Sequence, residues 1–213
     1  MKKRTNLIGL LLTVAILLFT TSCSQVTDLF SKDGVSLRDS AEVAALEAIL
    51  LDKIDPETQI TKIQFNKGQT DQSNFSFVKG TVVVFHVNPE NPDEELAFCI
   101  DVKKKEVYKN TFAENYNRTI HRNQKANVIK ASELNAMGVG QIATFVMKAV
   151  RAMESEKITA NGIGSYTIYA NPNPDKIEHS FAIEHIVSTT GRMINYEDYK
   201  FKVILGDGEL KQS

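Results

Sequence analysis

Two Asn-Pro turns, each placed between two strand-like segments, constrain the fold of this chain more than any other feature. The segment GTVVVFHVNPENPD at 80–93 leads to FCID at 98–101, and GSYTIYANPNPD at 164–175 leads to FAIE at 181–184. Proline lacks the backbone N–H that a sheet ladder needs, so each Asn-Pro pair ends a strand. The matching order of segments predicts a duplication, and chance similarity between two turn-rich hairpins is the alternative.

A helix is expected ahead of the strands in each half. Apolar residues recur at three- and four-residue spacing in 40–54 and in 142–153, which is the spacing of one buried helical face. The predicted fold class is therefore α+β, with two repeated units, each a helix packed on an antiparallel β-meander. Extended segments are expected at 60–65, 75–87, 96–102, 106–111, 165–170, 180–187 and 199–205.

The domain boundaries follow from this reading. We expect a leader at 1–22, a tether at 23–36, a first α+β unit at 37–112, a polar linker at 113–130 and a second α+β unit at 131–208. Large buried side chains contribute about 1.5–3 kcal/mol each, so such units need no disulfide for stability.

The first 22 residues have the form of a signal peptide. Lys2, Lys3 and Arg4 precede an uncharged apolar run at 7–19, and small polar residues then lead to Cys23. A helical run of this length covers about 20 Å, less than the roughly 30 Å hydrocarbon core of a bilayer. A membrane-spanning anchor is therefore the weaker interpretation.

The tetrapeptide Thr20-Thr21-Ser22-Cys23 resembles the lipobox of bacterial lipoproteins. The resemblance implies cleavage before Cys23 and lipidation of that residue with acyl chains such as palmitate. It also implies a location in the bacterial cell envelope, at the outer membrane, because Ser24 rather than Asp follows the cysteine. The membrane, reached through Cys23, is then one expected partner.

The mature region resembles the PepSY-like and β-lactamase-inhibitor-like families of exported bacterial proteins. The resemblance depends on the order of helix and meander, used twice, and on FCIDVKKKEVY at 98–108, which is similar to the closing hairpin of a PepSY unit. It implies tandem α+β units and transfers no functional residue. A cystatin-like sheet wrapped on a helix fits the same order.

Composition and spacing exclude several kinds of site. The net charge of −1 provides no basic excess for a phosphate backbone, so no nucleic-acid partner is expected. With two Cys and four His, we expect neither a metal nor a cofactor. In a strand, His179 and His185 would lie about 20 Å apart, too far for one ion to bridge.

Two further features have structural explanations. Cys99 has no His near it in the sequence, so we expect a small packing residue rather than a nucleophile. Gly138 and Gly140 lack the entering strand of a phosphate-binding loop and are expected to separate a short turn from the long helix.

The candidate functional residues lie on the strands of the second half. Tyr166, Tyr169 and Tyr196, together with Glu184 and His185, form a tentative binding surface, because exposed Tyr side chains anchor interfaces. For most of the Tyr residues the alternative is a role in the core or in strand propensity. No catalytic residue is assigned. The predicted function is a lipid-anchored exported binding module of the cell envelope, without catalysis, that recognises a protein, peptide or envelope component. The alternative is an envelope hydrolase in which Glu184 and His185 converge with other groups in space.

Overall fold

The computed structural model describes residues 34–66, 75–77, 81–120, 127–191 and 193–213. The leader, the lipobox with Cys23 and most of the tether lie outside the described residues, so lipidation stays a prediction. No helix within the described ranges is long and apolar enough to cross a membrane.

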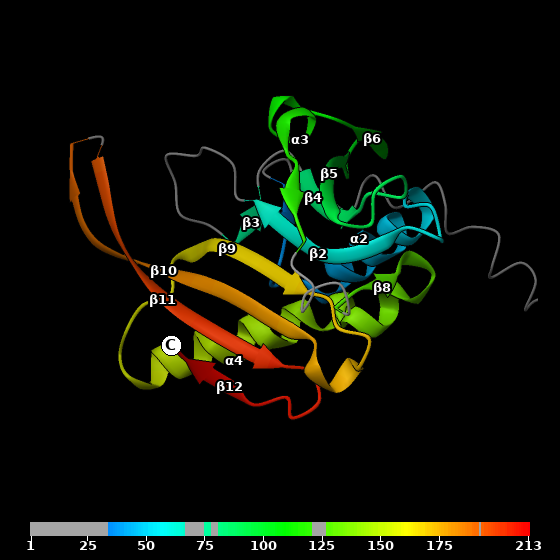
Figure 1. The fold of residues 1–213 in the computed structure, drawn as a ribbon. Coiled ribbons are helices and arrows are strands. Elements are labelled where there is room, and N and C mark those ends of the chain that lie inside the picture. Colours follow the sequence, from blue (N-terminus) through cyan, green and yellow to red (C-terminus); the bar gives the residue numbers. More distant parts are fainter. Residues whose placement is uncertain (1–33, 67–74, 78–80, 121–126, 192) are drawn as a thin grey trace, which may run out of the picture.

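One antiparallel sheet dominates the fold (Figure 1). Its main path runs in the order β12, β11, β10, β9, β2, β4, β5, β6, and the short strands β7 and β8 pair with β5 and β2. A separate pair is formed by β1 (Val35–Ser36) and β3 (Ser76–Phe77). The strands of the large sheet are β2 (Gln59–Asn66), β4 (Thr81–Val87), β5 (Glu94–Asp101), β6 (Glu106–Tyr108), β7 (Arg118–Thr119), β8 (Ile129–Lys130), β9 (Gly162–Tyr169), β10 (Glu178–Thr190), β11 (Met193–Ile204) and β12 (Leu210–Gln212).

Two helices, α2 (Ser40–Lys53) and α4 (Ile142–Ser155), contact each other and pack into the main core on one face of the sheet. The carboxylate of Asp39 accepts hydrogen bonds from two backbone N–H groups in the first turn of α2, which fixes where that helix begins. The other helical elements within the described ranges are the short helix α3 (Thr111–Asn115) and the 3-10 turns η3 (Ala131–Met137), η4 (Val139–Gln141) and η5 (Pro174–Lys176).

The prediction of two repeated units, each a helix on its own meander, is wrong. The central strands β2 and β9 pair antiparallel, with Lys62 opposite Tyr169, so the strands of both halves form one sheet. The two helices also share one hydrophobic core, which contains Leu46 of α2 and Phe145 of α4. Two separate meanders would each leave an open strand edge, and the pairing of β2 with β9 removes both edges.

The two Asn-Pro turns mark different places in this sheet. The first connects β4 to β5, and the second leads from the central strand β9 to β10. What they share is local turn chemistry. The side-chain oxygens of Asn88 and Asn171 each accept a hydrogen bond from the backbone N–H two residues further on. The sequence similarity therefore reflects a common type of turn rather than equivalent strands.

Alternation along β4 divides its side chains between two hydrophobic clusters. Val82 and Val84 belong to the main core beneath the helices, whereas Val83 and Phe85 belong to a smaller cluster. We call this smaller cluster the second cluster, and its members are Val83, Phe85, Ala97, Cys99 and Ala113, with Tyr116 packed against it. Ala113 of α3 is part of it, so α3 covers the face of the sheet opposite α2 and α4. Cys99 is fully buried there, and burial raises the pKa of its thiol.

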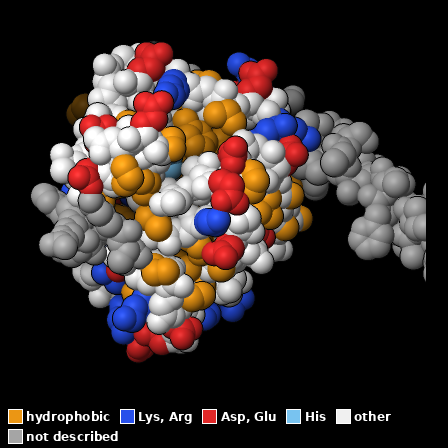
Figure 2. All heavy atoms as spheres, turned by 45° about the vertical axis from the view of Figure 1, so that its right-hand side comes forward, with side chains coloured by type: hydrophobic (Ala, Val, Ile, Leu, Met, Phe, Trp, Pro, Cys, Tyr) orange, Lys and Arg blue, Asp and Glu red, His pale blue; other side chains and the backbone are white. Residues whose placement is uncertain are grey.

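The strands β10 and β11 extend past the end of β9 as a two-stranded arm (Figure 1). The pairing of β9 with β10 ends at Glu184, whereas the pairing of β11 with β10 continues to Thr190. Two large apolar side chains on the arm are exposed, Val187 at 57% and Met193 at 67%. Elsewhere, the face drawn in Figure 2 interleaves hydrophobic, acidic and basic side chains.

Candidate functional site

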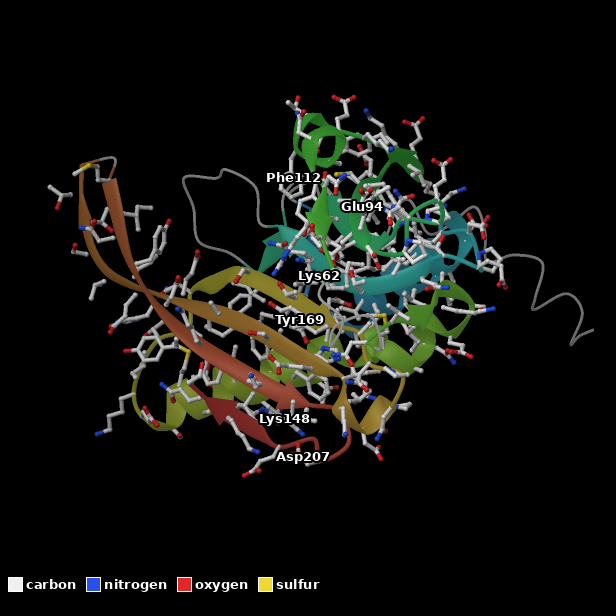
Figure 3. All side chains as sticks on the ribbon, in the orientation of Figure 1. Lys62, Glu94, Phe112, Lys148, Tyr169 and Asp207 are labelled. Carbon is white, nitrogen blue, oxygen red and sulfur yellow. The ribbon has the colours of Figure 1, made fainter. Side chains whose placement is uncertain are left out.

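A cavity of about 140 Å³ opens near the middle of the sheet, where β2 and β9 meet. Lys62, on its wall, lies over the ring of Phe85 from the second cluster, which places the cavity on the face opposite α2 and α4. Figure 3 labels Lys62 and Tyr169 in this region. The cavity is lined by Thr61, Lys62, Glu95, Arg118, Thr119, Ile120, Asn127, Tyr169 and Ala170.

A β-bulge in β2 supplies two of the lining side chains. The register of β2 against β4 shifts by one residue between Ile60 and Lys62, which makes Thr61 the extra residue. Regular alternation would point Thr61 and Lys62 to opposite faces, but here both interact with Glu95. The same bulge keeps Ile60 and Ile63, three positions apart, in the main core.

Glu95, at the start of β5, is 8% exposed and is held by two hydroxyl groups. Its Oε1 accepts a hydrogen bond of 2.5 Å from the hydroxyl of Thr61, and its Oε2 accepts one of 2.5 Å from the hydroxyl of Tyr116. Burial, followed by the hydrogen bond to Glu95, raises the pKa of Tyr116 to about 12. Glu95 therefore has a fixed position and contributes a negative charge to the lining of the cavity.

The ammonium group of Lys62 lies between this carboxylate and an aromatic ring. Its Nζ is 3.9 Å from the ring centroid of Phe85 and 3.9 Å from Oε2 of Glu95. The second distance exceeds that of a hydrogen bond, so the ion pair is not a direct one. Partial burial lowers the pKa of Lys62, and the charge of Glu95 acts in the opposite direction.

Arg118 and Tyr169 complete the site from neighbouring strands. Arg118 on β7 is directly opposite Glu95 on β5, and its side chain is exposed. Tyr169 on β9 is opposite Lys62 on β2 and is 45% exposed. Among the lining residues within the described ranges, Lys62 and Arg118 are thus two cations and Glu95 is the one acid.

The three Tyr residues of the tentative binding surface lie in different surroundings. Tyr169 lines the cavity. Tyr166 is completely buried, and its hydroxyl lies 2.8 Å from Nδ1 of His179 inside the main core. Tyr196 is half-buried on β11, in the part that forms the arm with β10.

Glu184 and His185 are not brought together. As neighbours on β10 they point to opposite faces of the sheet. Glu184 is buried and directly opposite Asp198 of β11. The Nδ1 atom of His185 lies 2.9 Å from the backbone oxygen of Thr159. This pair does not form the assembled site that the hydrolase alternative requires.

The sequence reasoning missed Lys62, Glu95 and Arg118. One signal for the site was present, because the buried residues of β2 are spaced three and then two apart, at Ile60, Ile63 and Phe65. A strand that buries one face has a spacing of two, so this irregularity predicts a bulge next to Lys62.

A second cavity, of about 440 Å³, lies between the turn after α2 and the turn between β4 and β5. It is lined by Asp55, Glu57, Thr58, Gln59, His86, Val87, Asn88, Pro89 and Pro92. Burial lowers the pKa of His86, and the charges acting on it are those of Lys109 and Glu95. Glu57 pairs with Lys130 at 2.6 Å. Glu57 of this cavity is therefore already engaged in an ion pair.

Within the part of the chain that the structure describes, no group of three or more His, Cys, Asp or Glu could hold a metal ion. Comparison of the chain with protein-family models, with curated proteins and with solved structures found no match.

Proposed function

We propose that this chain is a lipid-anchored binding module of the bacterial cell envelope that acts without catalysis. It is attached at the outer membrane through Cys23 and holds its ligand in the cavity between β2, β5, β7 and β9. The observation that carries the proposal is the partly buried ammonium of Lys62 at the wall of that cavity, with exposed Tyr169 beside it.

The position of Lys62 removes part of the water from around its ammonium group. The carboxylate of Glu95 lies too far away for a direct hydrogen bond. Lysine carries three N–H donors, which a bound ligand can engage. Partly dehydrated polar groups with open donors are found at sites where proteins recognise ligands.

The hydrolase alternative has less support. It needs acids and His side chains that converge on one cavity, and Glu184 and His185 lie on opposite faces of β10. The lining of the first cavity offers Glu95, whose two oxygens already accept hydrogen bonds from Thr61 and Tyr116.

The experiment is capture of partners from an envelope extract of the source organism. The bait is the full chain in detergent, compared with Lys62→Met, Tyr169→Ala and the control Lys200→Met, which changes an exposed Lys outside the cavity. We expect a component retained by the wild type and the control and lost from the two cavity variants. Equal capture by all four proteins, or substrate turnover that disappears in His185→Ala, would contradict the proposal.

A further inference from the structure

We infer that the cavity takes a monoanionic ligand that presents a carboxylate, held between Lys62 and Arg118. This inference names the ligand class of the proposed binding site and therefore depends on the proposed function. Its basis is the charge and the donor chemistry of the lining residues.

The charge balance favours one negative charge. Among the lining residues that the structure describes there are two cations and one acid, and that acid is buried and fixed by the hydroxyls of Thr61 and Tyr116. One negative charge on the ligand balances the charges of these described residues, whereas a second would be repelled by Glu95. A cationic ligand would be repelled by Lys62 and Arg118. The carboxylate of Glu95, which could attract it, already accepts hydrogen bonds from Thr61 and Tyr116.

The donors also fit a carboxylate. The side chain of Arg118 hydrogen-bonds the hydroxyl of Tyr116. Its guanidinium carries five N–H donors in a planar fork, a group that binds carboxylates with parallel hydrogen bonds. The side-chain oxygen of Asn127 accepts a 3.3 Å hydrogen bond from Asn171, which leaves the amide N–H groups of Asn127 as the part that can donate to a ligand. Thr119 adds a hydroxyl to the lining.

The size of the cavity limits what accompanies the carboxylate. A volume of about 140 Å³ is small for a ligand pocket, so it holds an acid group and a short hydrocarbon. A longer ligand would continue over the exposed ring of Tyr169, which offers an apolar surface beside the cavity. Two sources provide this chemistry, a free short-chain organic acid and the C-terminal carboxylate of a peptide.

The test measures binding to the full chain in detergent by isothermal titration calorimetry. The probes are propionate, N-acetyl-alanyl-alanine, the C-terminal amide of the same dipeptide, propylammonium and inorganic phosphate. We expect the two acids to bind, and the amide to bind at least about tenfold more weakly, because it lacks the charge-assisted hydrogen bonds. Lys62→Met and Arg118→Gln should each weaken binding of the acids by about tenfold, while Lys200→Met should not change it.

Every outcome decides the inference. Tighter binding of the dipeptide acid than of propionate identifies a peptide C-terminus, and equal or tighter binding of propionate identifies a free acid; each of these results supports the carboxylate site. The inference is overturned if the amide matches its acid, if propylammonium or phosphate binds more tightly than both acids, or if no acid binds. In those cases envelope capture that depends on Lys62 and Tyr169 would still support a binding module with a different ligand. Unfolding curves of each variant show whether it remains folded.

Discussion

The hydroxyl of Tyr166 and the Nδ1 atom of His179 lie 2.8 Å apart in the main core, on adjacent strands β9 and β10. The Nε2 atom of His179 lies 2.9 Å from the backbone oxygen of Met137, which can only accept. Nε2 therefore carries the proton, and Nδ1 accepts from Tyr166. Both ring nitrogens of a neutral His179 are satisfied, and burial lowers the pKa of its imidazole to about 4.

This pKa predicts a loss of stability in mild acid. The unfolded chain takes up a proton on His179 near its ordinary pKa of about 6.5, whereas the folded chain stays neutral until about pH 4. The stabilising contribution of the neutral His179 to the unfolding free energy is present above pH 6.5 and is lost as the pH falls toward 4. Between pH 7 and pH 5 we expect His179 to account for about 2 kcal/mol of the loss in unfolding free energy, measured with urea. In His179→Leu this part of the pH dependence should disappear, and an unchanged slope would contradict the assignment.

A matched pair of glycines separates backbone strain from packing. Gly138, between η3 and η4, has φ +70°, and a Cβ there would lie 2.9 Å from Leu205 and 3.2 Å from Nε2 of His179. Gly208 has φ +59° with nothing within 4 Å of the same position. We expect Gly208→Ala to cost about 1 kcal/mol from the left-handed backbone alone, and Gly138→Ala about 1 kcal/mol more. Equal unfolding free energies for the two variants would show that Leu205 and His179 adjust without cost.

The helices could be predicted because their signal is local. The segment expected at 40–54 is α2 at Ser40–Lys53, and Gly138 ends η3 in a left-handed conformation, as expected for a break before the long helix. Apolar spacing within a segment shows which face is buried, but it does not name the partner strand. The pairing of β2 with β9 joins Lys62 to a residue more than a hundred positions away, so no local pattern predicted it.

Strand alternation alone could have predicted that Tyr166 and Tyr169 lie on opposite faces of the sheet. Tyr166 and Tyr169 are three positions apart, so one regular strand cannot present both on the same face. The structure buries Tyr166 with Ile168 in the main core and leaves Tyr169 45% exposed. The charged residues of the cavity, Lys62 and Glu95, come from separate strands, and their proximity depends on the bulge at Thr61.

Attachment to the membrane is predicted to depend on Cys23. In Cys23→Ser no acyl chain can be added, so the protein should move from the membrane fraction to the soluble envelope fraction. Two acyl chains anchor a protein stably in a membrane, and a polypeptide without them lacks this anchor. Fractionation and the mass of the mature chain measure this directly. The control is Cys99→Ser, which removes the buried thiol and leaves the lipobox intact. A Cys23→Ser protein that keeps its processed mass and its membrane attachment would refute the prediction.

Replacing Lys62 and replacing Glu95, each in its own variant, should change the unfolding free energy by unequal amounts. Lys62→Met removes a partly desolvated ammonium while Glu95 keeps its hydrogen bonds from Thr61 and Tyr116, so the unfolding free energy should change by less than about 1 kcal/mol. Glu95→Ala leaves the ammonium without its counter-charge and the two hydroxyls without their acceptor, and we expect a loss of about 3 kcal/mol or more. Urea unfolding at pH 7 measures both values. If Lys62→Met were as destabilising as Glu95→Ala, Lys62 would be held for stability rather than for a ligand, which would contradict the proposed binding site.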